Sequence, residues 1–332
     1  MHRNSFDALR ALAAGGVIVS HAFQITSGTL DTEPLHRISR GQLTLGDLCV
    51  AAFMVISGYL VTGSWVRRPD AKRFLTARAL RLLPALAVVV LALIALGGLL
   101  TTAAGYWTDP GTWSYLRNIL LHAPQQALPG VFEGNPLPLV NGSLWTLEYE
   151  VACYLILLVA GLAGLARRWL ALPALLALAV GFLFVDLLPQ RLYVWLPACF
   201  LAGATLYLWQ DRIRWSGWLA LGGVALVILG TLFGGMHAAV VLGGAYALVY
   251  AGRSTALSAW GKQGDPSYGV YLWGWPVQQI LMQAGVTSPA LNAALALAVA
   301  FALGFISWHL IEKPALALIR RPKTEQVTVT LS

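Results

Sequence analysis

The sequence predicts an all-α protein, a polytopic bundle of about ten transmembrane helices with both ends of the chain in the cytoplasm. Three observations support this prediction. Of the 332 residues, 58% are hydrophobic and only 11% are charged, whereas a soluble domain carries about 25% charged residues. Apolar stretches long enough to cross a bilayer follow one another along almost the whole chain. The Lys and Arg residues gather in alternate connections between these stretches, which fixes their orientation.

The ten predicted spans are joined mostly by short connections. They cover residues 7–26, 43–63, 80–105, 146–166, 170–188, 192–210, 216–235, 237–252, 267–286 and 289–311. With the N-terminus inside, the cytoplasmic segments hold 18 of the 22 Lys and Arg residues and the outer segments hold the other four. This asymmetry obeys the positive-inside rule and supports both the orientation and the span count. The basic excess is thus explained by topology, and no nucleic-acid partner is expected.

The spans form one membrane-embedded domain, residues 1–314, followed by a short basic and polar cytoplasmic tail, residues 315–332. The one long connection, residues 106–142, lies on the outer face and is rich in Pro, Gly and aromatic residues. We expect it to be ordered, either as a lid over an outer site or as a structural cap. No metal-binding spacing is present in the sequence, and three cysteines in apolar segments are expected to be core residues: Cys49, Cys153 and Cys199.

The first candidate site lies in the first span, where Arg10 and His21 are eleven positions apart. That spacing is three helical turns plus about 20°, so both side chains share one face about 16 Å apart along the axis. A neutral imidazole can take a proton from a hydroxyl group. The alternative is a histidine that only joins helices by a hydrogen bond, but the aligned Arg10 favours function. Asp7, one turn before Arg10, is placed with them as a supporting residue.

The second candidate site enters the fourth span from outside and contains Glu148 and Glu150. Glu150 is the deeper of the two and lies one turn before Tyr154, a supporting residue. Because His21 is in the outer half of its span, Glu150 could meet it at a similar depth and fix its tautomer. The alternative is that both glutamates are solvated or paired with a cation, and for Glu148 we favour that alternative.

The third candidate site is the basic stretch 73–84, which contains Arg73, Arg78 and Arg81. Arg78 and Arg81 are three apart, so they are neighbours on a helix. Guanidinium groups suit phosphate because they form bidentate charged hydrogen bonds. On composition alone, topology and contact with lipid headgroups explain this stretch better.

The segment 264–279 opens the ninth predicted span and carries a polar and aromatic stripe of Ser267, Tyr268 and Tyr271. These three are supporting candidates for a site in the bundle. Ser267 is a poor candidate nucleophile because no base lies near it in the sequence.

Two further segments have structural interpretations. Ser57 and Gly58 are small residues that would let helices approach closely. Glu312 and Lys313, followed by Pro314, predict a helix stop with a local ion pair.

Taken in order, these segments resemble acyltransferase family 3, a family of integral membrane O-acyltransferases of carbohydrates. The first match is the spacing of Arg10 and His21. The others are FMVISGYL (53–60), RALRLLP (78–84), SLWTLEYE (143–150), SYGVYLWGWP (267–276) and LIEKP (310–314). Each motif alone is weak, but six in the family's order cover nearly the whole chain.

The resemblance implies transfer of an acyl group, usually acetyl, from cytoplasmic acyl-CoA to a hydroxyl on a carbohydrate or related acceptor. It implies that His21 is the catalytic base, that Arg10 is essential, and that Arg78 and Arg81 contact the CoA phosphates. Phosphate binding then becomes the favoured interpretation of the basic stretch.

The sequence departs from the family pattern at two positions. Glu148 stands where the family commonly has Ser, while Glu150 keeps the acidic position. Gly274 stands where many members have His, which places more weight on His21. No hydrolase-like extension follows the last span, so we expect the acceptor to be bound by the membrane domain, by residues 106–142 or by a partner.

The expected mechanism has CoA docked at the inner basic rim, with its pantetheine arm passing Arg10 so that the thioester reaches His21. His21 then deprotonates the acceptor hydroxyl or accepts the acyl group itself, and Glu150 orients its ring.

Acetyl-CoA is a substrate, and no permanently bound cofactor is expected. Expected partners are a lipid-linked glycan or other carbohydrate and the lipids of a bacterial inner membrane. The alternative is a transporter or flippase for a lipid-linked glycan without acyl chemistry, although the internal repeats common in transporters are not evident.

Overall fold

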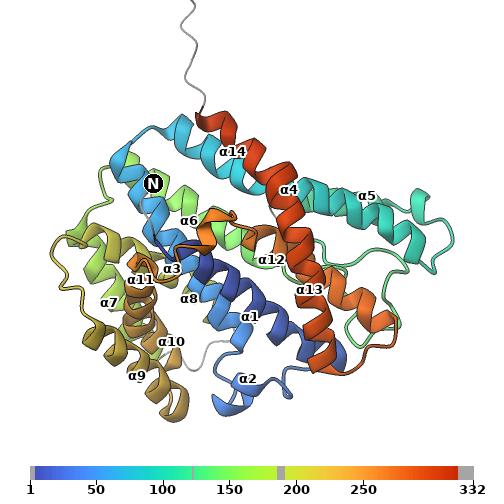
Figure 1. Ribbon diagram of the computed structural model, residues 1–332, viewed down its shortest axis with the longest axis horizontal. Coiled ribbons are helices and arrows are strands. Elements are labelled where there is room, and N and C mark those ends of the chain that lie inside the picture. Colours follow the sequence, from blue (N-terminus) through green and yellow to red (C-terminus); the bar gives the residue numbers. More distant parts are fainter. Residues whose placement is uncertain (1–3, 122, 185–190, 321–332) are drawn as a thin grey trace, which may run out of the picture.

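The computed structural model describes residues 4–121, 123–184 and 191–320, and these residues form helices and loops without any strand (Figure 1). Over this part of the chain, each predicted span coincides with a helix or with helices joined by a wide π turn. The longer helices are α1 (Phe6–Ser27), α3 (Leu45–Arg67), α4 (Ala71–Leu100), α6 (Trp145–Leu162), α7 (Arg168–Phe184), α8 (Arg191–Leu208), α9 (Gly217–Phe233), α11 (Ala245–Arg253), α12 (Ser267–Gln283) and α13 (Pro289–Ser307). The all-α prediction is therefore confirmed.

Five helical stretches of the described residues are long and apolar enough to cross a membrane. They are α1, α3, α4, α6 and the continuous stretch Pro289–Ile319; three apolar helices are shorter, Arg168–Phe182, Val194–Leu208 and Gly217–Phe233. The count of ten spans and the side on which the termini lie stay predictions.

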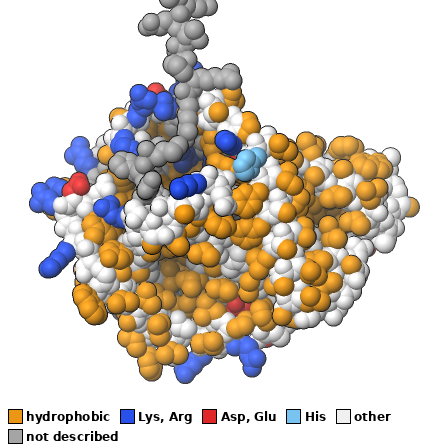
Figure 2. Space-filling view, viewed as in Figure 1, with side chains coloured by type: hydrophobic (Ala, Val, Ile, Leu, Met, Phe, Trp, Pro, Cys, Tyr) orange, Lys and Arg blue, Asp and Glu red, His pale blue; other side chains and the backbone are white. Residues whose placement is uncertain are grey.

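The outer surface of the bundle is apolar, as a lipid-facing surface must be. On α9, the exposed fractions are 84% for Trp218 and 81% for Phe233. Soluble monomers rarely expose large contiguous apolar patches. Figure 2 shows Lys and Arg side chains gathered toward the upper left of the molecule and others at its lower edge, with apolar surface between. The chain is an integral membrane protein.

The centre of the bundle is the crossing of α3 and α8, where two glycines allow backbone contact. A Cβ added at Gly58 would lie 2.0 Å from the Phe200 carbonyl oxygen, and one added at Gly203 would lie 2.0 Å from the Val55 carbonyl oxygen. Neither helix could come so close with a side chain at these positions. The prediction of close packing at Gly58 is confirmed.

The first helix, α1, packs against α12 and α13. Helices α1, α12 and α13 share a small apolar cluster that includes Ala14, Val270 and Ala300, all 0% exposed. Gly304 brings α13 onto α12, because a Cβ there would lie 2.9 Å from the Pro266 carbonyl oxygen. This packing places α1 beside the segment that precedes α12.

The predicted helix stop at 312–314 is wrong. A π turn, η5 (Trp308–Glu312), follows α13 directly, and α14 (Lys313–Arg320) continues the helix across α4 (Figure 1). Pro314 lacks an N–H, and the wider turn just before it accommodates that missing donor. The predicted ion pair of Glu312 with Lys313 is also not formed, because Glu312 pairs with Arg81. The predicted boundary at 314 thus falls inside a helix, and residues 321–332 of the tail lie outside the described residues.

The long connection 106–142 is ordered against the bundle over its described residues, as its aromatic content predicts. It contains the short helices η1 (Tyr106–Thr108), α5 (Pro110–Ser114) and η2 (Tyr115–Leu120). Its last part is fastened to α12, since the Asn135 amide donates to Gln279 and the Trp275 indole donates to the Leu139 carbonyl.

Candidate functional site

A cavity of about 1260 Å³ opens between α1, α3, α4, α6, α12 and the turn that ends α13. This is larger than a typical small-molecule pocket of about 300–1,000 Å³. Nine of the eleven predicted site residues line it: Asp7, Arg10, Arg78, Arg81, Glu150, Tyr154, Ser267, Tyr268 and Tyr271. Among the described residues, His21 and Arg73 are the two predicted ones outside this lining.

One wall of the cavity is a buried ion cluster. Oδ2 of Asp265 lies 2.6 Å from Nη2 of Arg81 and 3.2 Å from Nη1 of Arg10. The other amino group of Arg81 lies 3.1 Å from Oε2 of Glu312, which is 1% exposed. Asp7 is more loosely associated, 4.0 Å from Arg10. The cluster therefore joins α1, α4, η5 and the turn before α12.

Asp265 is the functional candidate that sequence reasoning missed. Its segment was singled out for Ser267, and the only local signal was an acid two residues before that serine. Burial alone would raise the pKa of Asp265, but the guanidinium groups of Arg81 and Arg10 hold it below its usual value. The Ser267 hydroxyl donates to this carboxylate. Because Asp265 is already committed to two arginines, it is a poor base for Ser267.

A second group on the cavity wall centres on Glu150. Its Oε1 accepts hydrogen bonds from the Ser57 hydroxyl, at 2.9 Å, and from the Tyr154 hydroxyl. The predicted pairing with His21 is not formed, since no hydrogen bond joins the two in the described structure. Ser57 is thus a site residue as well as a small packing residue.

Arg78 faces this group from α4. Its guanidinium carbon lies 5.7 Å from the Tyr154 ring centre and 5.9 Å from that of Phe74. Within the described residues, it forms no ion pair, and its Nε is buried without a hydrogen-bond partner. Arg78 is thus held by aromatic rings and keeps its donors available.

His21 lies three turns along α1 from Arg10, next to Trp275, whose indole donates to the Leu139 carbonyl near the end of the connection 106–142. The two rings meet edge-on with their centres 4.7 Å apart, and Nδ1 of His21 is buried without a hydrogen-bond partner among the described residues. A Cβ added at Gly274 would lie 2.7 Å from Cγ1 of Ile18. A histidine at 274, where many family members carry one, would therefore collide with α1 in this packing.

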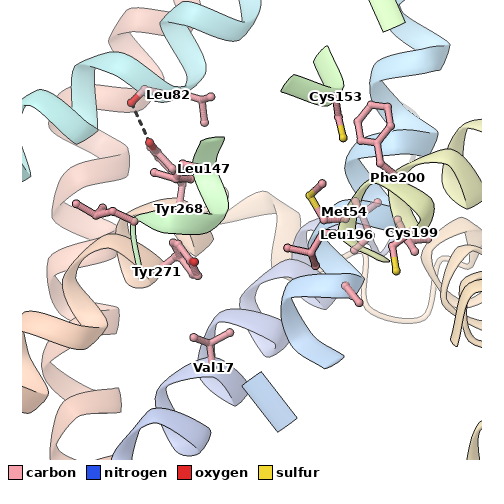
Figure 3. Packing of buried hydrophobic residues seen from close by; sticks show 14 of the residues in the cluster. Val17, Met54, Leu82, Leu147, Cys153, Leu196, Cys199, Phe200, Tyr268 and Tyr271 are labelled. Carbon is pink, nitrogen blue, oxygen red and sulfur yellow. Dashed lines mark hydrogen bonds between the residues drawn. The ribbon is translucent and has the colours of Figure 1, made fainter. Parts of the chain in front are cut away.

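The remaining predicted residues have structural contacts. Tyr268 donates to the Leu82 carbonyl (Figure 3). Tyr271 donates to the Ser143 carbonyl, so both tyrosines fasten α12 to its neighbours. Arg73 is exposed in the first turn of α4, where its backbone N–H is capped by Asp70. Outside the cavity lining, Glu148 accepts a hydrogen bond from the Ala123 N–H.

This arrangement can accommodate a long, flexible, phosphorylated molecule. The lining ends in exposed basic residues, Arg67, Lys262 and Lys313, and continues to uncharged and aromatic side chains such as Phe53 and Tyr271. Charged donors suit phosphate groups, and the less polar part suits an uncharged arm.

Comparison with known proteins identifies the family of this chain. The family model for the acyltransferase domain, acyltransferase family 3, matches residues 3–309. Nodulation protein 10 of Rhizobium leguminosarum bv. viciae is 29% identical over 379 aligned positions, which cover 96% of this chain and 94% of that protein. The O-acetyl transferase of Shigella phage Sf6 is 27% identical, covering 94% of this chain and 96% of that protein. No solved structure matches. The chain therefore belongs to acyltransferase family 3 and is a membrane acyltransferase.

Proposed function

We propose that this protein transfers an acetyl group from cytoplasmic acetyl-CoA to a hydroxyl of a cell-surface or lipid-linked carbohydrate. We place it in a bacterial inner membrane with both termini in the cytoplasm. The observation that carries the proposal is the cavity, which combines a basic rim, an available Arg78 and a large volume within the membrane domain. The similarity to a phage O-acetyl transferase supports acetyl as the transferred group.

The donor enters from the basic side in this proposal. Its phosphates meet the exposed Lys262 and Lys313 at the rim and Arg78 within. The pantetheine arm then passes the wall formed by Arg10, so that the thioester approaches the level of His21 along α1. Because Arg10 and His21 lie on the same face of α1, the route from one to the other follows a single helix face.

The chemistry assigned to His21 is general base catalysis. The acceptor hydroxyl oxygen attacks the thioester carbonyl carbon, and the imidazole takes the hydroxyl proton. The carbon–sulfur bond then breaks, and the CoA thiolate leaves and takes up a proton. The unpartnered Nδ1 of His21 supports this role, because a base must have an unused lone pair.

The acceptor approaches from the outer side, where residues 135–143 pack over α12 beside His21. Glu150 has a different role from the one its spacing suggested. It holds the hydroxyl groups of Ser57 and Tyr154 on the cavity wall and so shapes the donor's path.

The testing experiment follows free CoA release from acetyl-CoA by the purified protein in detergent or vesicles. Wild type should release CoA, His21→Ala and Arg10→Ala should abolish release while remaining folded, and His36→Ala, a histidine on α2 (Pro34–Ile38) away from the cavity, should not. Release that persists in His21→Ala would remove the proposed base. If CoA release requires the acceptor, the CoA assay is replaced by O-acetyl analysis of surface glycans from cells that express the same variants. Glycan movement without acetyl transfer would favour the transporter alternative.

A further inference from the structure

We propose that the two neighbouring arginines of α4 have different tasks: Arg78 binds the donor's phosphate, whereas Arg81 is a positioning residue held by Asp265 and Glu312. This inference rests on the proposed function for its donor. Their sequence spacing gives them one helix face and predicts no difference between them. The difference comes from the residues that the tertiary structure places around each.

Arg81 is already fully engaged. Its two terminal amino groups reach two different carboxylates, at 2.6 Å to Asp265 and 3.1 Å to Glu312. Both carboxylates are buried, with exposed fractions of 6% and 1%. If Arg81 turned to a phosphate, Glu312 would lose its cation and Asp265 would keep only Arg10, which is strongly unfavourable for buried carboxylates.

The net charge of the cluster also disfavours an anion. Arg10 and Arg81 carry two positive charges, and three carboxyl groups, those of Asp7, Asp265 and Glu312, lie within ion-pair distance of them. A phosphate at this wall would compete with carboxylates that already hold both arginines. It is therefore a poor anion site although it contains two arginines.

Arg78 has the opposite surroundings. It lies on the cavity lining, stacked over Tyr154 and Phe74, and within the described residues it has no carboxylate partner. These ring contacts hold the guanidinium without using its N–H donors, and Nε is buried without a hydrogen-bond partner among the described residues. A bound phosphate would supply the missing acceptor.

The cluster has a positioning task because of what it joins. Arg81 connects α4 to η5 and, through Asp265, to Arg10 on α1. It thereby fixes the distance between the walls of the cavity and the place of Arg10. Removing Arg81 should disturb the transfer step for any donor, with or without phosphates.

The test compares acetyl-CoA with S-acetylpantetheine, which lacks the nucleotide and its phosphates. For Arg78→Ala, we expect KM for acetyl-CoA to rise at least tenfold, with kcat/KM for S-acetylpantetheine and the thermal unfolding temperature unchanged. For Arg81→Ala, we expect kcat to fall by the same factor with both donors and the unfolding temperature to fall. Lys72→Ala, which removes a charge from an exposed position on the same helix, should behave as wild type.

Conservative variants separate the two roles further. Arg78→Lys should recover most of the acetyl-CoA affinity, because a lysine still offers a point charge to phosphate. Arg81→Lys should remain impaired, because one ammonium group cannot span two carboxylates. Adding Glu312→Gln to Arg81→Ala should raise the unfolding temperature again, because it removes the buried carboxylate that has lost its cation, whereas adding it to Arg78→Ala should lower it.

The division of tasks would be overturned if Arg78→Ala and Arg81→Ala raised KM equally, with acetyl-CoA only, and left the unfolding temperatures unchanged. A wild-type protein that transfers acetyl from neither donor would instead refute the proposed function and, with it, the role of Arg78. The stability cycle of Arg81 and Glu312 needs no donor, so it tests the positioning role separately.

Discussion

Replacing Gly58 by alanine tests the close crossing of α3 and α8 that forms the centre of the bundle. The new Cβ would lie 2.0 Å from the carbonyl oxygen of Phe200 and 3.1 Å from the backbone nitrogen of Ala204. Ordinary contacts of a Cβ begin at 3.4 Å, so α8 would have to retreat by more than an ångström. Both nearest neighbours are backbone atoms, and no side chain can turn aside to relieve the overlap.

The magnitude follows from two opposing effects. Overpacking costs about 1–3 kcal/mol, and the absence of any yielding side chain places this site near the upper value. Alanine gains back about 1 kcal/mol in helix propensity over glycine. We therefore expect Gly58→Ala to destabilise the protein by about 2 kcal/mol. We also expect lower activity, because the neighbouring Ser57 would lose its 2.9 Å hydrogen bond to Glu150.

The assay is thermal unfolding of the purified protein in detergent, with CoA release measured well below the transition. The matched control is Gly222→Ala on α9, where nothing lies within 4 Å of an added Cβ. The control should unfold at the wild-type temperature or above it. Equal unfolding temperatures for the two variants would refute the close crossing.

Three other predictions address the site. Gly274→Leu should lower both stability and CoA release, because its Cβ would lie 2.7 Å from Ile18, one turn before His21 on α1; unchanged unfolding and turnover would contradict this packing. Glu150→Gln should reduce CoA release about fivefold, whereas Glu148→Gln should retain it, because only Glu150 lines the cavity and only its carboxylate holds the Ser57 and Tyr154 hydroxyls by charge-assisted hydrogen bonds; similar losses in both would argue against this assignment. The pKa of Asp265 is lowered in the folded protein, so its stabilisation is present above its ordinary pKa of 3.8 and is lost as the pH falls further. The difference in unfolding temperature between wild type and Asp265→Asn should thus stay constant from pH 7 to 5 and disappear below pH 3.8. Convergence of the two temperatures near neutral pH would contradict the assignment.

The sequence by itself determined the helical class, the approximate places of the helices and the in-phase position of Arg10 and His21. These are local properties, since apolar length and helical periodicity are set by neighbouring residues. The sequence also predicted a close approach of two helices at Gly58, because small residues in apolar helices commonly mark helix–helix contacts. Nine of the eleven site residues selected from the sequence line the cavity.

Only the tertiary structure decided which charges pair. Asp265 meets Arg81 across 184 positions of sequence and Arg10 across 255, and no local pattern encodes such a contact. Glu312 was assigned to its neighbour Lys313, yet the π turn directs it to Arg81. Glu150 likewise meets Ser57 rather than His21. Helical phase fixes the face on which a side chain lies, but only the packing of helices fixes what that face meets.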